Sequence, residues 1–194
     1  DNSAISETSQ ADMLALLGRQ RENYLAEGVV SVAKRKDRLE RAIGLLQTHQ
    51  DRLVAAMRDD FGHRSEHQSM FTDIAGSIGP LRHAQAHVEK WVKPEKRNVG
   101  PFPLNLLGAK ARIEFQPLGV VGVISPWNFP VNLTFTPLAG ILAAGNRCMI
   151  KPSEFTPATS EVMAEIFPMA FDELEIAVIT GGPQTGADFS GLPF

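Results

Sequence analysis

The sequence predicts an α/β protein built from N-terminal helices, a β-hairpin and part of a parallel sheet, and three observations predict it. Residues 10–93 carry apolar side chains at helical spacing. Residues 109–116 alternate between apolar and polar side chains. After residue 117, short apolar runs alternate with helical stretches, which is typical of βαβ units. We therefore divide the chain into a helical part, an arm and a βαβαβ part, at residues 1–99, 100–117 and 118–194.

Composition restricts the classes of partner. The chain is 43% hydrophobic and 21% charged, which is ordinary for a globular protein, and its net charge of -3 gives no reason to expect nucleic acid or a membrane as partner. The N-terminus (DNSAISETSQ) is a polar tail without the pattern of a secretory signal. The single cysteine, Cys148, excludes an internal disulfide and fits a reducing compartment, so we expect a cytoplasmic location.

The N-terminal part should contain several helices. Ser31 is a candidate N-cap for a helix whose apolar residues recur at helical spacing. We expect a break at residues 48–51 (THQD), with Asp51 capping a second helix that stops at Gly62. Another helix should follow over residues 65–91.

The arm should contain a half-exposed strand over residues 109–116. Its apolar members, Ala111, Ile113 and Phe115, share one side, and charged residues occupy the other. We place this strand in a hairpin. One-sided strands on extended arms often join subunits, although the pattern is equally compatible with a hairpin inside one chain.

The last part should form the parallel sheet. Three strands are expected at residues 120–124, 147–151 and 176–180, and helices at 131–144, 157–170 and from 183 to 189. Such sheets bind ligands beyond the carboxyl ends of their strands. ISPWNFP, KPSE and GGPQTG follow the three strands in turn. We therefore expect these three unusual sequences on one rim.

The third of these sequences, GGPQTG at residues 181–186, has the outer glycines of a phosphate loop. Ala187 and Asp188 stand where such a loop needs Lys and Ser or Thr, so a nucleoside triphosphatase is not expected. The GxGxxG dinucleotide fingerprint is also missing. Two interpretations stay open: backbone N–H groups that receive a phosphate at a helix N-terminus, or a plain turn.

Polar residues of the other two rim sequences have a functional and a structural interpretation. Lys151 and Glu154 could bind ribose hydroxyls and a phosphate, or form a surface salt bridge that contributes little. Asn128 lies between two prolines, and its amide could be the fixed donor of an oxyanion hole. Alternatively, it caps the helix that starts near Val131.

The remaining candidates favour structural roles. Cys148 lies inside an apolar strand, and we interpret it as a core residue and not as a nucleophile. His83 and His87 have the i, i+4 spacing of zinc ligands, but Ala84 stands where a metalloprotease needs Glu. We interpret them, and likewise His63 and His67, as surface residues and expect no metal site.

One long segment resembles a known family. Residues 117–159 read PLGVVGVISPWNFPVNLTFTPLAGILAAGNRCMIKPSEFTPAT, with PWNFP followed by KPSE about twenty residues later. This segment resembles the N-terminal, Rossmann-like cofactor-binding portion of the aldehyde dehydrogenase superfamily. Together with LLGAKARIEF before it, the amino-acid sequence of this segment is most similar to that of the coniferyl aldehyde dehydrogenases. The resemblance is specific over residues 100–183.

The resemblance implies roles for individual residues. Asn128 matches the asparagine that stabilises the oxyanion of the tetrahedral intermediate. The implied cofactor is NAD, with NADP possible, and Glu154 favours NAD. The nicotinamide side of the cofactor is implied to contact Ile124, Ser125, Pro126 and Trp127. The adenosine ribose is implied to contact Lys151, Ser153 and Glu154. The adenine and its phosphates are implied to lie near Gly182, Pro183 and Ala187.

The resemblance also implies a reaction that this chain alone cannot complete. The family oxidises an aldehyde to the acid through a cysteine thioester, and its catalytic cysteine and general-base glutamate are expected beyond residue 194. We therefore expect a fragment without the catalytic domain, inactive alone, from a full-length protein that acts on coniferyl or a similar aromatic aldehyde. The arm implies a homodimer or homotetramer. The alternative is a noncatalytic nucleotide-binding or assembly module that ends at Phe194.

Overall fold

The computed structural model describes residues 7–100, 102–104 and 106–194. Its elements in chain order are α1 (Gln10–Glu27), α2 (Val32–Phe61), α3 (Glu66–Ser69), η1 (Met70–Ala75), α4 (Gly76–Trp91), β1 (Glu95–Arg97), β2 (Ala111–Ile113), β3 (Val120–Ile124), α5 (Asn132–Ala144), β4 (Arg147–Lys151), α6 (Pro157–Ala170), β5 (Ile176–Val178) and α7 (Pro183–Ser190). The predicted α/β class, with helices, an antiparallel pair and a parallel sheet, is confirmed. Of the predicted polar tail, residues 1–6 lie outside the described residues.

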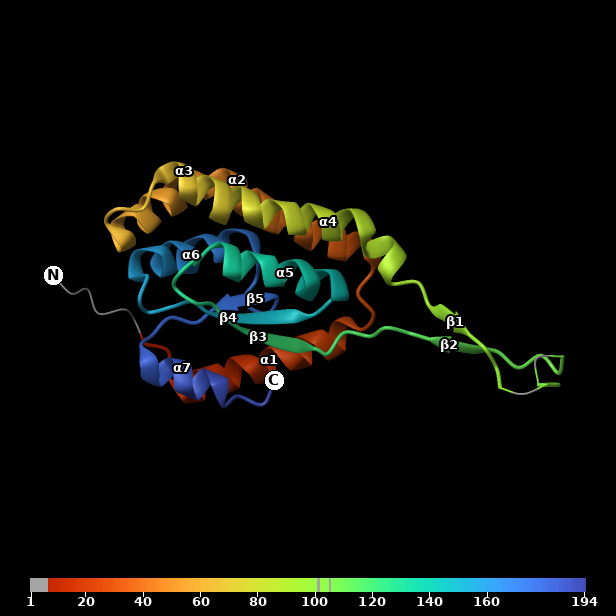
Figure 1. Cartoon of the computed structure of the whole chain (residues 1–194). Coiled ribbons are helices and arrows are strands. Elements are labelled where there is room, and N and C mark those ends of the chain that lie inside the picture. Colours follow the sequence, from red (N-terminus) through yellow and green to blue (C-terminus); the bar gives the residue numbers. More distant parts are fainter. Residues whose placement is uncertain (1–6, 101, 105) are drawn as a thin grey trace.

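The body of the molecule is layered around the parallel sheet. Figure 1 shows α5 and α6 on one face of the sheet, with α2 and α4 stacked beyond them. The opposite face is covered by α1 and α7, and a two-stranded arm made of β1 and β2 projects away from this body (Figure 1). Among the described helices, none combines the length and the apolar character that a bilayer span needs.

The first two helices begin where serine caps them. The Ser9 hydroxyl accepts a hydrogen bond from the Asp12 N–H at the start of α1. Ser31 caps α2 as predicted, through the Lys34 N–H at 3.2 Å. Gly62, with a left-handed φ of 69°, is the C-cap that follows the last residue of α2. The predicted break at residues 48–51 is wrong, because α2 is one continuous helix of 30 residues.

The predicted helix over residues 65–91 forms, but as α3, η1 and α4 in succession. The middle piece, η1, is a π-helix of six residues, which the sequence analysis did not anticipate. Ile74 in η1 and Leu81 in α4 are buried. A carbonyl of η1 accepts a hydrogen bond from outside this helix: the Asn132 side-chain amide donates to the Thr72 carbonyl at 2.9 Å.

The arm consists of two short antiparallel strands, in which Lys96 of β1 faces Arg112 of β2. The predicted strand over residues 109–116 is shorter than expected, and its partner β1 lies within the segment assigned to the helical part. Ile113 and Phe115 are 40% and 59% exposed. The apolar side of the arm is therefore not covered by the body of this chain.

The parallel sheet has the order β3-β4-β5, and both pairings are parallel. Its two faces contribute to two cores. On one side, Cys148 and Ile150 join the residues of α5 and α6, where the rings of Phe135 and Phe167 stack at 5.1 Å. On the other side, Met149 packs with residues of α1 and α7. Because both faces are covered, the strands read as continuous apolar runs.

Candidate functional site at the carboxyl ends of the strands

The three unusual sequences lie along one edge of the sheet. They follow β3, β4 and β5, whose carboxyl ends point the same way. Two backbone bonds extend the pairing just past the strands: Ser125 N–H donates to the Lys151 carbonyl at 3.0 Å, and Ile179 N–H donates to the Ile150 carbonyl at 2.7 Å. We call this edge, with the residues that follow the strands, the rim.

At the end of β3, apolar side chains are open to solvent. Ile124 is 57% exposed and Trp127 is 52% exposed, and Pro126 between them is also exposed. Ser125 points the other way, because its buried hydroxyl accepts a hydrogen bond from the Thr134 hydroxyl of α5 at 2.7 Å. Exposed apolar surface of this kind is typical of a place that contacts a ligand or another part of a protein.

Asn128 follows Trp127 in the same loop, and its side chain is exposed. Within the described part of the chain, its amide group makes no hydrogen bond, although its backbone carbonyl accepts one from Arg64 at 2.9 Å. It does not cap α5. That role belongs to Asp73, whose Oδ1 accepts from the N–H groups of Val131 and Asn132 at 3.2 and 3.1 Å. The structural interpretation of Asn128 is therefore wrong, and its amide faces outward.

At the end of β4, a charged pair forms across the KPSE turn. The Lys151 side chain is buried, and its ammonium donates to the Pro152 carbonyl at 2.8 Å and to Glu154 Oε2 at 3.2 Å. Glu154 is only half-buried, so part of its carboxylate can reach a ligand. Ser153 is buried, and its hydroxyl accepts from the Phe155 N–H at 3.2 Å.

Asp60 supports this turn from the end of α2, a role that the sequence analysis missed. Its carboxylate accepts hydrogen bonds from the N–H groups of Ala158 and Thr159, both at 2.9 Å. Asp60 thus caps α6 in place of a local residue. No local sequence pattern predicts this contact, because Asp60 and Ala158 are far apart in sequence.

At the end of β5, glycines shape the entry into α7. Gly181 has a φ of 147°, and a Cβ there would come within 2.2 Å of Thr185 Oγ1. Gly182 is the N-cap of α7 and offers no side chain to its first turn. Pro183 and Ala187 are exposed on that helix. Among residues 7–100, 102–104 and 106–194, no side chain caps the first-turn N–H groups of α7.

The residues interpreted as structural lie where predicted. Cys148 is completely buried, and this burial raises the pKa of its thiol well above the usual range, so it is not a nucleophile. His83 and His87 are exposed on α4, with their rings stacked at a centroid distance of 4.1 Å. His63 and His67 are exposed as well.

The opposite edge of the sheet carries a network of buried charges. Glu27 of α1 contacts Arg38 of α2 at 2.9 Å and Arg147 of β4 at 2.5 Å. Burial raises the pKa of the Glu27 carboxyl, but hydrogen bonds from Lys34, Arg38 and Arg147 outweigh it and lower that pKa to about 2. This network connects the first two helices to the sheet and lies away from the rim.

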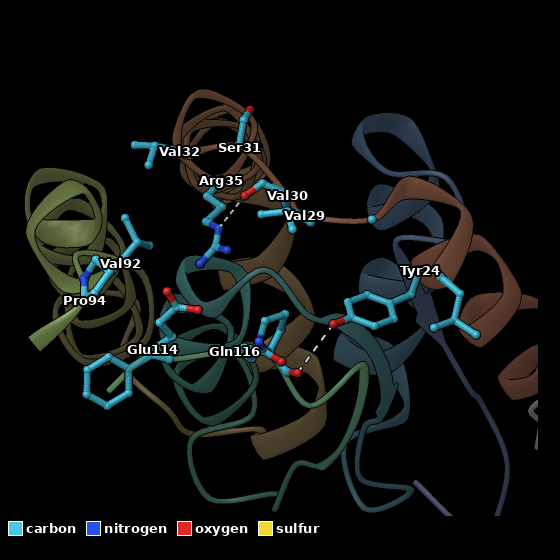
Figure 2. Close-up of a pocket in the computed structure, with 14 residues that line it drawn as sticks. Tyr24, Val29, Val30, Ser31, Val32, Arg35, Val92, Pro94, Glu114 and Gln116 are labelled. Atoms are coloured by element: carbon cyan, nitrogen blue, oxygen red, sulfur yellow. Dashed lines mark hydrogen bonds between the residues drawn. The ribbon is translucent and has the colours of Figure 1, made fainter. Parts of the chain in front are cut away.

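The base of the arm is hollowed. Two adjoining hollows of about 550 and 610 Å³ share Arg35, Val92 and Phe115. Figure 2 shows the first, with Tyr24 and Arg35 lying around the chain that leaves the arm at Gln116. Neither hollow includes a residue of the rim. The polar groups that converge along the strand ends therefore identify the candidate site better than hollow volume does.

Known proteins match nearly the whole of this chain, over part of their own length. A protein of Caulobacter vibrioides named "Probable coniferyl aldehyde dehydrogenase" is 56% identical over 189 residues, which are 97% of this chain and 39% of that protein. The coniferyl aldehyde dehydrogenase of a Pseudomonas species is 49% identical over 92% of this chain and 36% of its own length. The chain therefore spans less than two fifths of these relatives.

Solved structures agree with the fold. The Staphylococcus aureus AldH, in a substrate-bound state, superposes with a TM-score of 0.86 at 27% identity, over 94% of this chain and 39% of that one. An NAD-dependent benzaldehyde dehydrogenase of Corynebacterium glutamicum gives a TM-score of 0.80 at 26% identity, over 97% and 40%. The family model described as "Aldehyde dehydrogenase family" matches residues 3–193. The chain belongs to the aldehyde dehydrogenase family.

Proposed function

We propose that this chain supplies the cofactor platform and the oxyanion donor of an NAD(P)-dependent aldehyde dehydrogenase that oxidises coniferyl or a similar aromatic aldehyde to the acid. One observation carries the proposal: the exposed Asn128 amide, which has no hydrogen-bond partner among the described residues, lies on the same rim as the Lys151–Glu154 pair and the start of α7. The aromatic substrate class is inferred from relatives named for coniferyl aldehyde.

The rim has donors and acceptors that suit a dinucleotide. Glu154 has a half-buried carboxylate that can accept two ribose hydroxyls, and Lys151 holds it in place at 3.2 Å. Ser153 lies beside them. The first turn of α7, at Gly182 and Pro183, can donate backbone N–H groups to a phosphate. We expect Ala187, one turn later, to lie near the adenine.

The β3 end would then face the nicotinamide. Ile124 and Trp127 expose apolar surface, and Pro126 fixes the backbone between them. When bound, the nicotinamide supplies the acceptor for the hydride that leaves the aldehyde carbon. The exposed apolar side chains would exclude water from that position, which protects a hydride transfer from competing reactions.

The chemistry at the aldehyde requires a nucleophile from outside these residues. In the proposed reaction, a cysteine thiolate supplied by sequence beyond residue 194 attacks the carbonyl carbon. The Asn128 amide donates a hydrogen bond to the oxygen that becomes negative in that step. A glutamate, also outside these residues, activates the water that hydrolyses the thioester. Cys148 takes no part because it is buried in β4.

The test uses the full-length gene product that contains this chain. It is assayed for aldehyde-dependent formation of NADH, with coniferyl aldehyde and with an aliphatic aldehyde of similar size. The proposal predicts oxidation of both, with a higher kcat/KM for the aromatic substrate. Failure to reduce NAD or NADP with any aldehyde would contradict the enzymatic proposal and favour a noncatalytic binding module.

The Asn128→Ala variant tests the oxyanion role in the same assay. Losing an amide donor from an oxyanion hole should lower kcat by roughly a hundredfold or more. The Kd for NAD should change much less, because the dinucleotide contacts are placed elsewhere on the rim. Asn98→Ala, at an exposed position that follows β1, is the comparison variant and should keep the wild-type kcat. An unchanged kcat in Asn128→Ala would contradict the oxyanion assignment.

A further inference from the structure

The loop that carries Asn128 has few bonds of its own. It runs from Ser125 to Val131 between β3 and α5 and contains no strand or α-helix. Its ends are fixed by neighbours in the sheet and in α5, through the Ser125 N–H at one end and the Pro130 carbonyl at the other. Its middle, around Asn128, is held from outside by residues that follow α2.

Arg64 makes the first of these outside contacts. Its Nη1 donates to the Asn128 carbonyl at 2.9 Å, and the residue is only 8% exposed. The guanidinium lies over two aromatic rings, Phe61 of α2 at 4.8 Å and Phe129 of the loop at 5.2 Å. A planar, charged group thus contacts the residue that bears the amide and the residue that follows it.

Asp73 makes the second contact, from η1. Its side chain is completely buried, and one oxygen pairs with Arg64 at 2.5 Å. The other oxygen accepts from the N–H groups of Val131 and Asn132, where the loop enters α5. The Arg64–Asp73 pair therefore holds the loop at the Asn128 carbonyl and again three and four residues later, at the N–H groups of Val131 and Asn132.

The π-helix brings Asp73 into this position. In η1 the Thr72 carbonyl accepts from the Asn132 amide, and the Thr72 hydroxyl donates to Asp73 at 3.0 Å. A Cβ on Gly76 would approach the Asn132 amide nitrogen to 2.8 Å, so the start of α4, directly after η1, and the start of α5 meet without spare room. Short π-helical segments occur frequently at functional sites.

A buried ion pair is weak evidence for stability, because desolvation of two charges offsets most of their attraction. Apolar residues could fill the same space between α2, η1 and α5. The pair instead fixes the loop by directional hydrogen bonds. Asp73 accepts two from N–H groups at the start of α5, and Arg64 donates one to the Asn128 carbonyl. That combination restricts the backbone from which the Asn128 side chain projects.

We propose that Arg64 and Asp73 are positioning residues that hold the Asn128 amide in the geometry needed to stabilise the oxyanion. The inference rests on the proposed function, since it assigns these two residues to act through Asn128. A displacement of about 1 Å in a catalytic group can cost roughly a hundredfold in rate. The pair should therefore influence the chemical step more than it influences cofactor binding.

The test is a double-mutant cycle in the full-length gene product. Arg64→Lys keeps the charge but lacks the planar fork, and Asp73→Asn keeps the shape but lacks the charge. Each is made alone and together with Asn128→Ala. Arg58→Lys is the matched control, because Arg58 lies one helical turn from the end of α2 in an exposed pair with Glu66. The readouts are kcat, the Kd for NAD, and hydrogen exchange of the peptide covering residues 125–135.

The proposal predicts that Arg64→Lys and Asp73→Asn each lower kcat by about tenfold to a hundredfold, with a smaller change in the Kd for NAD. Exchange of the 125–135 peptide should speed up, and Arg58→Lys should match the wild type in every readout. In the Asn128→Ala background, the two variants should add little further loss, because the group they position is gone.

Two results would overturn the positioning role while leaving the proposed function intact. One is a wild-type kcat in both Arg64→Lys and Asp73→Asn. The other is a full, additive loss in the Asn128→Ala background, which would mean a purely structural effect. A wild-type kcat in Asn128→Ala alone would instead contradict the oxyanion assignment, and with it the basis of this inference. If one pair variant does not fold, the other completes the cycle.

Discussion

Glu154 is the residue whose charge should decide between the two nicotinamide cofactors. Its carboxylate is half-buried at the end of β4 and bonded to Lys151. A carboxylate that accepts the ribose hydroxyls favours NAD, because the 2′-phosphate of NADP would meet its negative charge. Neutralising this carboxylate should therefore affect the two cofactors differently.

We predict that Glu154→Gln in the full-length gene product raises the Kd for NAD and leaves the Kd for NADP unchanged or lower. The measurement is a titration of each cofactor, followed by the quenching of protein fluorescence. Glu161→Gln, at an exposed position of α6, serves as the control and should leave both Kd values unchanged. Equal weakening of both cofactors would count against a ribose contact.

At the scale of elements, the parallel sheet was predictable and several connections to it were not. Residues 120–124 and 147–151 are short apolar runs, and the apolar stretch between them is long enough for a helix, so β3, α5 and β4 form as expected. Gly182 and Pro183 indicated the start of α7 in the same way. These elements were predictable from local sequence. Because both faces of the sheet are covered, its strands are nearly continuous apolar runs that are easy to identify.

Contacts over long sequence distances explain what was missed. The polar residues 48–51 suggested a helix end, but Leu46, Leu53 and Met57 keep one buried face in phase through them, and tertiary packing keeps α2 continuous. A carboxylate at Asp73, one residue before buried Ile74, was a possible signal of a buried polar role. Its partners in α5 could not be read from the local pattern.

The arm leaves several large apolar side chains open to solvent. Ile113 and Phe115 are exposed, and at the tip Leu106 and Leu107 are 72% and 77% exposed. We propose that this surface pairs with another subunit in a homodimer or homotetramer. Replacing Ile113 and Phe115 by Asp should then shift the assembly toward smaller species.

Light scattering after size-exclusion chromatography measures that shift on the full-length gene product. Met169→Asp, on an exposed apolar residue of α6 that is 63% exposed, is the control for adding a charge to the surface. It should keep the wild-type mass. An unchanged mass in the Ile113→Asp, Phe115→Asp variant would contradict the proposed role of the arm.

At the scale of the whole molecule, the two edges of the sheet differ in chemistry. The rim carries exposed polar groups and apolar side chains, whereas the opposite edge holds the half-buried Glu27 among three cations. Because the folded pKa of Glu27 is lowered to about 2 from 4.5, its stabilising contribution is complete above pH 4.5. It is lost as the pH falls from 4.5 through 2.

We therefore predict that the free energy of unfolding decreases between pH 4.5 and 2, and that Glu27→Gln makes this decrease less steep. Urea denaturation at a series of pH values measures it. Glu22→Gln, at an exposed position of the same helix, should keep the wild-type slope. Identical slopes for Glu27→Gln and the wild type would show that this carboxyl is not linked to folding as the structure implies.

The central claim is that three strand ends, distant in sequence, form one cofactor platform. Hydrogen exchange of the full-length gene product, measured with and without saturating NAD, tests it most directly. We predict that NAD slows exchange in peptides covering residues 124–128, 151–154 and 181–187, and leaves the arm peptides at 95–97 and 111–113 unchanged. Slower exchange only at the base of the arm, or no change at the three rim peptides, would contradict the account.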